Sequence, residues 1–67
     1  MKIALQIKVK RHKLGLNQQD LAKLAKLSPE YIGKIEREEI LNVGIKTLEK
    51  IAKALKTSVI DLMREAA

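Results

Sequence analysis

The single proline of this chain, Pro29, directly follows Ser28, and this pair predicts the start of a helix. A serine before the first turn accepts a hydrogen bond from a free backbone amide, and a proline in that turn gives up only a donor that has no partner there. Ile32 and Ile35 follow on one side of the expected helix. The pattern therefore predicts a helix over residues 29–37 that buries one side and leaves the other side free.

Apolar residues recur at intervals of three and four along nearly the whole chain, and glycine and proline are rare. Gly15 is expected to end a first helix whose inward side carries Ile3, Ile7 and Leu14. Asn17 and Ser58 are expected to cap two later helices. The sequence predicts an all-α fold, one domain over residues 1–67 with five packed helices, at about 3–14, 18–25, 29–37, 45–56 and 59–65.

The composition excludes several classes of function. The chain has no cysteine and one histidine, His12, so disulfides, zinc ribbons, thiol nucleophiles and histidine-containing triads are not expected. A solvated role is expected for His12 rather than a pH-sensing one. No nucleophile, base and orienting group can be assembled, so we expect no enzyme, no metal, no cofactor and no small-molecule ligand.

Neither a leader nor a membrane segment is expected from the sequence. Polar residues interrupt the apolar run of residues 1–8, which argues against a signal peptide. No stretch approaches the roughly 18 apolar residues of a membrane span. The expectation is a soluble cytoplasmic protein without a membrane partner.

Positive charge is unevenly distributed along the chain, whose net charge is +6. Residues 1–34 carry eight basic and two acidic side chains, whereas residues 35–67 carry six of each. A one-sided basic excess is typical of proteins with a polyanionic partner. A solvated lysine-rich surface would explain the composition alone equally well.

The expected helices 18–25 and 29–37 lie on either side of a turn at about residues 26–28. Ala22 is small enough for the two helices to pack closely, and Leu27 is expected to fill the turn. Two short helices joined in this way are typical of a helix-turn-helix over residues 18–37.

The motifs, in this order and spacing, resemble the Xre-type helix-turn-helix family, which includes the lambdoid phage repressors (Cro/CI-like). They are Ile7-Lys8-x-Lys10-Arg11-x-x-Leu14-Gly15-Leu16-Asn17-Gln18-x-x-Leu21-Ala22, Leu27-Ser28-Pro29-x-Tyr31-Ile32-x-Lys34-Ile35-Glu36-Arg37 and Leu48-Glu49-Lys50-Ile51-Ala52-Lys53-Ala54-Leu55. The resemblance implies a lambda-repressor-like fold and a homodimeric repressor of transcription that reads the major groove of double-stranded DNA. It also implies a prokaryotic or phage-encoded, nucleoid-associated protein.

The resemblance also assigns residues to the expected DNA interface. Residues expected to read bases are Pro29, Glu30, Tyr31, Gly33 and Lys34. Residues expected to contact phosphates are Asn17, Gln18, Lys10, Arg11 and Lys46. Arg11 and Glu36 are expected first to form a structural ion pair. Alternatives remain for two of these residues, since Gln18 could simply begin a helix and Tyr31 could fill the core.

Three features depart from the family pattern. Lys26 and Glu38 stand where glycine is common, and a left-handed backbone would cost roughly 1 kcal/mol or more at either one. The expected loop over residues 38–43 is longer than in many relatives, and it is acidic and apolar. Ile40 and Leu41 of this loop could pack over the core or, together with Ile60 and Met63 of the last expected helix, form a dimer surface. A protein-interaction module, such as an antitoxin or a coactivator-like domain, is therefore the alternative function.

Overall fold

The computed structural model describes residues 3–64 and places five helices and no strand among them, which confirms the predicted all-α fold. The helices are α1 (Ile3–Lys13), α2 (Gln18–Ala25), α3 (Pro29–Glu36), α4 (Ile45–Ala54) and α5 (Val59–Met63). Each begins where the sequence predicts, and all but α2 end one or two residues earlier than predicted. Glu65, the predicted end of the last helix, lies outside the described residues.

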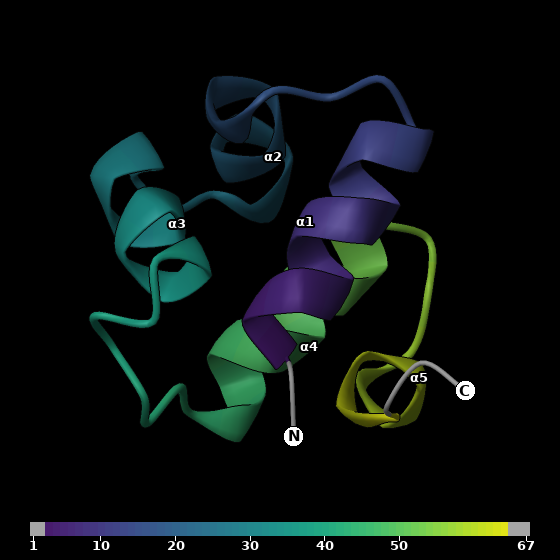
Figure 1. Cartoon of the computed structure of the whole chain (residues 1–67). Coiled ribbons are helices and arrows are strands. Elements are labelled where there is room, and N and C mark those ends of the chain that lie inside the picture. Colours follow the sequence, from purple (N-terminus) through teal and green to yellow (C-terminus); the bar gives the residue numbers. More distant parts are fainter. Residues whose placement is uncertain (1–2, 65–67) are drawn as a thin grey trace.

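The crossing of α1 and α4 forms the middle of the molecule, and the other three helices pack on either side of it (Figure 1). In Figure 1, α1 crosses in front of α4, with α2 and α3 on one side and α5 on the other. α2 packs against both α3 and α4, while α1 packs against α3 and α5. Among the described residues, no helix is long and apolar enough to cross a membrane.

Side-chain caps explain why three of the helices begin where they do. Asn17 Oδ1 accepts a hydrogen bond from the Asp20 amide at 2.7 Å, and Asp20 Oδ2 accepts one from the Asn17 amide at 3.0 Å. Ser28 Oγ accepts from the Tyr31 amide at 3.1 Å, and Ser58 caps α5 in the same way. These contacts satisfy amides that have no partner within the helix. The helix starts are therefore set by local chemistry that the sequence carries.

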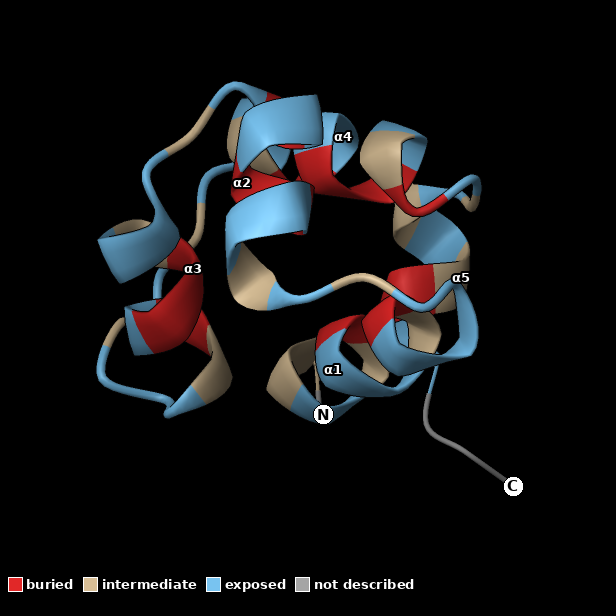
Figure 2. Ribbon diagram, turned by 90° about the horizontal axis from the view of Figure 1, so that it is seen from above, coloured by how far each residue is buried: buried red, intermediate tan, exposed pale blue. Residues whose placement is uncertain are grey.

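Each helix contributes one of the largest fully buried side chains to the core. They are Ile7, Leu21, Ile32, Ile51 and Leu62. Figure 2 shows that the buried parts of the helices face one another, while exposed residues cover the outside. The core therefore depends on all five helices.

Leu14 corrects one prediction about the core. It was expected to face inward, but 41% of its surface is exposed. α1 ends at Lys13, and Gly15 then reverses the chain with a left-handed φ of 71°. Leu16, which follows the turn, packs against the core in its place. A helix one residue shorter than expected thus changes which leucine is buried.

Three residues other than glycine adopt the left-handed backbone conformation among the described residues. Lys26 and Glu38, which stand where glycine is common in the family, have φ of 57° and 61° and so adopt the left-handed conformation despite its cost, and Lys56 has φ of 57°. Lys26 ends α2, and the following Leu27 amide donates to the Ala22 carbonyl at 2.8 Å. Such a conformation costs about 1–2 kcal/mol for a residue with a Cβ atom. The chain therefore holds lysine at two helix ends where glycine would be less strained.

Candidate nucleic-acid interface

The start of α2 and the outer side of α3 form a shallow groove of about 360 Å³. Its lining residues are Gln18, Gln19, Pro29, Glu30, Gly33, Lys34 and Arg37. We call this the reading groove. Four of the five predicted base-reading residues line it, and so does Gln18. The structure thus brings together residues from both helices of the predicted helix-turn-helix.

Two residues of the reading groove, Gln19 and Arg37, were not singled out by the sequence. Arg37 follows Lys34 by three positions and Gly33 by four, a spacing that places all three on one side of a helix. That spacing could have identified Arg37. Gln19 had no comparable signal apart from its neighbour Gln18.

Tyr31 was expected to read bases, but it does not line the reading groove. It is half-buried and packs against the hydrophobic core. An aromatic ring buries a large apolar area, so the inward position is favourable. The structure thus favours the alternative in which Tyr31 fills the core.

Gly33 was expected on the exposed face of the helix, yet it is buried. A Cβ atom added there would lie 2.9 Å from Arg37 Nη1 and 3.5 Å from Gln18 Oε1. Two side chains therefore lie over this position, one from α2 and one from the end of α3. The glycine lets them approach the α3 backbone, and it offers no open surface to a base.

Arg11 forms the expected ion pair with Glu36. Arg11 Nε lies 2.8 Å from Glu36 Oε2, Nη2 donates to Glu36 Oε1 at 2.9 Å, and Nη1 donates to the Leu16 carbonyl at 2.8 Å. Only 7% of Arg11 is exposed, and each of its three nitrogens has a partner. The guanidinium thus ties α1 to α3 through three of its N–H groups, and the phosphate contact of Arg11 stays a prediction.

Gln18 joins this network from α2, where its Nε2 donates to Glu36 Oε1 at 3.2 Å. Burial acts to raise the pKa of Glu36, but hydrogen bonds from Arg11 and Gln18, with the charges of Arg11 and Lys8, outweigh it and lower the pKa below its usual value. Glu36 is therefore held as a carboxylate between three helices. The Gln18 side chain helps to hold it through one of its two N–H groups, and the backbone amide of Gln18 has no partner among the described residues.

The N-terminus of α2 opens toward the reading groove. The capping box occupies the amides of Asn17 and Asp20, and among the described residues the amides of Gln18 and Gln19 have no partner. Free amides and the positive end of the helix dipole favour an anion at such a position. The exposed Asn17 lies at the same end of the helix.

Charges around the reading groove are nearly balanced. Lys34 and Glu30 are both exposed on α3. Arg37 Nε donates to Glu39 Oε2, which raises the pKa of Arg37 and lowers that of Glu39 through the hydrogen bond and the attraction of opposite charges. Both partners are more than half exposed, so the pair can open toward another anion.

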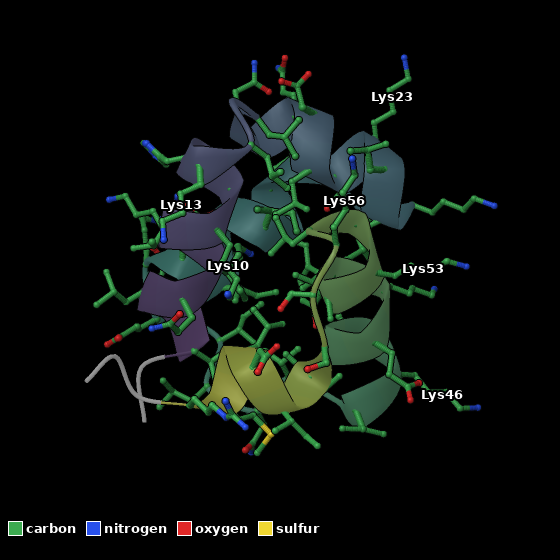
Figure 3. All side chains as sticks on the ribbon, turned by 90° about the vertical axis from the view of Figure 1, so that its right-hand side faces the viewer. Lys10, Lys13, Lys23, Lys46, Lys53 and Lys56 are labelled. Atoms are coloured by element: carbon green, nitrogen blue, oxygen red, sulfur yellow. The ribbon has the colours of Figure 1, made fainter. Side chains whose placement is uncertain are left out.

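The two lysines expected at phosphates do not line the reading groove. Figure 3 looks onto the side of the molecule opposite α3, and it shows Lys10 on α1 and Lys46 projecting from the start of α4. Lys8, rather than Lys10, acts on Glu36 at the end of α3. The structure thus gives Lys10 and Lys46 no direct place beside the predicted base-reading residues.

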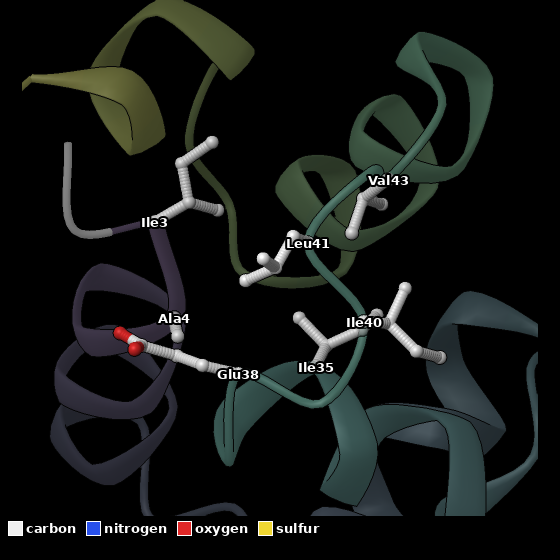
Figure 4. Close-up of a pocket in the computed structure, with 7 residues that line it drawn as sticks. All are labelled: Ile3, Ala4, Ile35, Glu38, Ile40, Leu41 and Val43. Atoms are coloured by element: carbon white, nitrogen blue, oxygen red, sulfur yellow. The ribbon is translucent and has the colours of Figure 1, made fainter.

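The four residues of the predicted dimer surface differ in how far they are exposed. Ile40 is half-buried and packs against the core, whereas Leu41, Ile60 and Met63 are 81%, 67% and 39% exposed. Figure 4 shows the cleft of about 280 Å³ beneath this loop, with Leu41 extending toward the start of α1 and Glu38 at the edge. The loop therefore folds in at Ile40 and remains open at Leu41.

Known proteins resemble this chain in sequence and in fold. Residues 7–62 match the family model described as helix-turn-helix. Control protein C.SmaI of Serratia marcescens is 47% identical over 49 residues, which are 73% of this chain and 57% of that protein. The chain thus spans little more than half the length of this relative.

Two solved structures share the arrangement of the helices. The N-terminal DNA binding domain of SinR from Bacillus subtilis is 35% identical, with a TM-score of 0.89 over 94% of this chain and 91% of that one. The restriction-modification controller protein C.AhdI from Aeromonas hydrophila is 32% identical, with a TM-score of 0.87 over 92% of each chain. The reading groove and the ion pair of Arg11 and Glu36 agree with this similarity in sequence and fold. The chain belongs to the Xre-type helix-turn-helix family.

Proposed function

We propose that this protein is a sequence-specific regulator of transcription that places α3 in the major groove of double-stranded DNA. The observation that carries the proposal is the reading groove, which combines free amides at the start of α2 with the donors Lys34 and Arg37 on α3. SinR, whose domain shares this fold, has been solved in complex with DNA. A groove of this kind offers both positioning contacts and base contacts.

The side chains of α3 suggest which base edges are read. Lys34 and Arg37 can donate to O6 and N7 of guanine, and Glu30 can accept from N4 of cytosine. Gln19 can pair with an adenine edge through its amide. The reading surface is therefore Gln19, Pro29, Glu30, Lys34 and Arg37, with Gly33 and Tyr31 in supporting positions.

Phosphate contacts in this proposal come mainly from the backbone amides of Gln18 and Gln19 at the start of α2. Lys8 and Asn17 are exposed nearby and can add to them. Lys10 and Lys46 are expected to contribute through the long-range field and to change the salt dependence only slightly.

In this proposal, the Glu39 carboxylate competes with DNA for the guanidinium of Arg37. Arg37 is paired with it in the free protein, so DNA must displace a carboxylate before the guanidinium becomes available. Replacing Glu39→Gln should raise the affinity for any duplex by about two- to five-fold at low salt, the range of an exposed pair.

The deciding experiment is selection of bound sites from a random duplex library, followed by fluorescence titration of the selected duplex over a range of salt. Lys34→Ala and Arg37→Ala should each weaken binding to that duplex by about ten-fold or more. Lys13→Ala, an exposed lysine at the end of α1 shown on the opposite side in Figure 3, is the matched control and should leave affinity within two-fold.

No binding to any duplex at low salt would contradict the proposal and would favour the protein-interaction module instead. The similarity to two controller proteins makes promoters of restriction-modification genes a reasonable first set of individual targets.

The proposal includes a homodimer that binds two half-sites about one helical turn apart. Leu41, Ile60 and Met63 are large apolar side chains with substantial exposure, and burying them against a second copy would be favourable. Sedimentation should show a concentration-dependent mass that Leu41→Ser with Ile60→Ser shifts to the monomer. A constant monomeric mass at high concentration would contradict the dimer.

A further inference from the structure

A second groove lies between the last turns of α2 and α4, and no residue that lines it also lines the reading groove. Its volume is about 460 Å³, and its floor is formed by Leu24, Ala25 and Ala54. Four lysines surround this floor, and they are Lys26, Lys50, Lys53 and Lys56. We call this the lysine-rimmed groove. Figure 3, seen from the side opposite α3, shows Lys53 and Lys56 there.

The lysine-rimmed groove combines an apolar floor with uncompensated positive charge. Leu24 lines the groove and is 58% exposed, and all four lysines are exposed. No acidic side chain lines the groove, and among the described residues none of these lysines forms an ion pair. This pattern contrasts with the reading groove, where Glu30 and Glu39 offset the basic residues.

Stabilisation of helix ends accounts for only part of this charge. Lysine near a helix C-terminus is favourable, because each C-terminus carries about half a negative charge. The two C-termini of α2 and α4 together offset about one of the four lysine charges. The two helix C-termini therefore leave most of the positive charge of the four lysines in place around Leu24, Ala25 and Ala54.

Two of the four lysines occupy strained positions. Lys26 and Lys56 both have φ of 57°, which glycine adopts at lower cost. They follow the ends of α2 and α4, so each places its side chain at the rim of the same groove. Strain kept at two related positions points to a use for the side chains.

We propose that the lysine-rimmed groove is a docking site for an acidic protein segment that carries a leucine-sized apolar side chain between its carboxylates. The apolar residue covers Leu24, Ala25 and Ala54, and the carboxylates pair with the lysines at the rim. α3 remains free for its own partner, so the segment can bind while DNA is held. A regulator could thus contact an acidic partner protein from the side that faces away from the duplex.

Two other occupants fit the observations less well. A DNA backbone would pair with the lysines but has no apolar group to cover the exposed Leu24. A second copy of this chain carries a net charge of +6, so two such chains repel each other at a surface lined with lysine. The combination of charge and apolar floor therefore favours an acidic peptide.

The test uses the full chain labelled with ¹⁵N and a fluorescent 16-residue peptide of glutamate and aspartate with one leucine at its centre. Amide shifts should concentrate at the ends of α2 and α4 and spare α3. A peptide with serine in place of leucine should bind at least five-fold more weakly, because the apolar contact is lost. A peptide with amides in place of carboxylates should not bind measurably.

Two pairs of substitutions test the lysines separately. Lys50→Gln with Lys53→Gln, and Lys26→Gly with Lys56→Gly, should each weaken peptide binding at least five-fold while DNA affinity stays within two-fold. The glycine pair relieves backbone strain, so loss of folding would not explain its effect. Lys10→Gln with Lys13→Gln removes the same charge from α1 and should leave peptide binding within two-fold.

Several results would overturn the proposal. One is equal binding of the leucine and serine peptides, which would indicate a nonspecific basic surface. Others are peptide shifts that centre on α3, unchanged binding by both pairs of groove variants, or a mass increase that shows self-association there. Shifts at this groove produced by a duplex that lacks the selected site would assign it to nucleic acid instead. None of these results would change the outcome of the DNA titration of the wild-type chain, so peptide binding and DNA binding are tested independently.

Discussion

The reading groove and the lysine-rimmed groove differ in how their charges are held. Around the reading groove, Arg11 is paired with Glu36 and Arg37 with Glu39. Around the lysine-rimmed groove, four lysines have no acidic partner among the described residues. Of these two grooves, the one with more unpaired lysines is therefore not the one that contains the predicted base-reading residues.

The two grooves also differ in what their charged residues cost the fold, namely burial of an ion pair at one and backbone strain at the other. The ion pair beneath the reading groove is buried, with side-chain exposures of 8% and 3%, and it connects α1 to α3. The lysines of the other groove are exposed, and their cost is backbone strain at two helix ends. Changes to the first region should therefore affect folding strongly, whereas changes to the second should affect it weakly or even favourably.

Arg11→Met should have the largest effect on stability. It leaves the buried Glu36 carboxylate with Gln18 as its remaining side-chain partner. Removing one partner of a buried ion pair typically costs about 3–5 kcal/mol, a large part of the stability of so small a chain. Urea denaturation followed by circular dichroism measures the loss.

The double variant Arg11→Met with Glu36→Leu is the control for this prediction. It removes both charges, so it should be more stable than Arg11→Met alone. A loss below about 1 kcal/mol in the single variant would show that the pair does not hold α1 against α3.

Acid should destabilise the chain through the same pair. The pKa of Glu36 is lower in the folded chain than its usual value of 4.5, so the carboxylate stabilises the fold fully above that usual value. This stabilisation declines as pH falls through about 4 and toward the folded pKa. The free energy of unfolding, measured by urea titration from pH 7 to pH 3, should fall more steeply for the wild type than for Arg11→Met with Glu36→Leu. Equal slopes would contradict the assignment to Glu36.

Lys26→Gly should have a smaller effect, and in the opposite direction. Relief of the left-handed conformation is offset in part by the greater freedom of glycine in the unfolded chain, so the expected gain is about 0.5–1 kcal/mol. Lys56→Gly should behave in the same way. Lys50→Gly is the matched control, because it lies within α4 and should lose about 1 kcal/mol. A loss at Lys26 equal to that at Lys50 would show that no strain is relieved there.

Features set by neighbouring residues could be predicted from the sequence. Asn17, Ser28 and Ser58 cap helices through contacts only three residues apart, and all three helix starts are as predicted. Lys26 and Glu38 were noted as standing where glycine is common, but that both keep the left-handed backbone was not predicted from the sequence. The pairing of Arg11 with Glu36 came from the family resemblance rather than from the spacing of the residues.

Features that depend on packing between helices could not be predicted in this way. The burial of Gly33 requires two side chains from different turns to lie over it, and no local pattern encodes that arrangement. The exposure of Leu14 follows from a helix that ends one residue early. Lys26 and Lys50 line one groove only because α2 packs against α4. The lysine-rimmed groove therefore became visible only in three dimensions.

Gly33→Ala should have the smallest effect on stability. It should nevertheless change DNA affinity, so it distinguishes an effect on folding from an effect on DNA recognition. Alanine within a helix gains up to about 1 kcal/mol over glycine, but the new methyl group would lie 2.9 Å from Arg37 Nη1 and must displace it. Because that nitrogen is the end of a flexible side chain, we expect the unfolding free energy to change by less than about 1 kcal/mol.

The reading groove should nevertheless be altered by this methyl group, because Arg37 has to leave its place over α3. We expect affinity for the selected duplex to fall by about ten-fold, close to the effect of Arg37→Ala, when measured by fluorescence titration. Gly44→Ala is the matched control, since a Cβ atom there meets nothing within 4 Å, and it should leave DNA affinity unchanged. Unchanged affinity in Gly33→Ala would mean that the guanidinium can contact DNA from a displaced position, and the contact between α2 and α3 would then be the only role of this glycine.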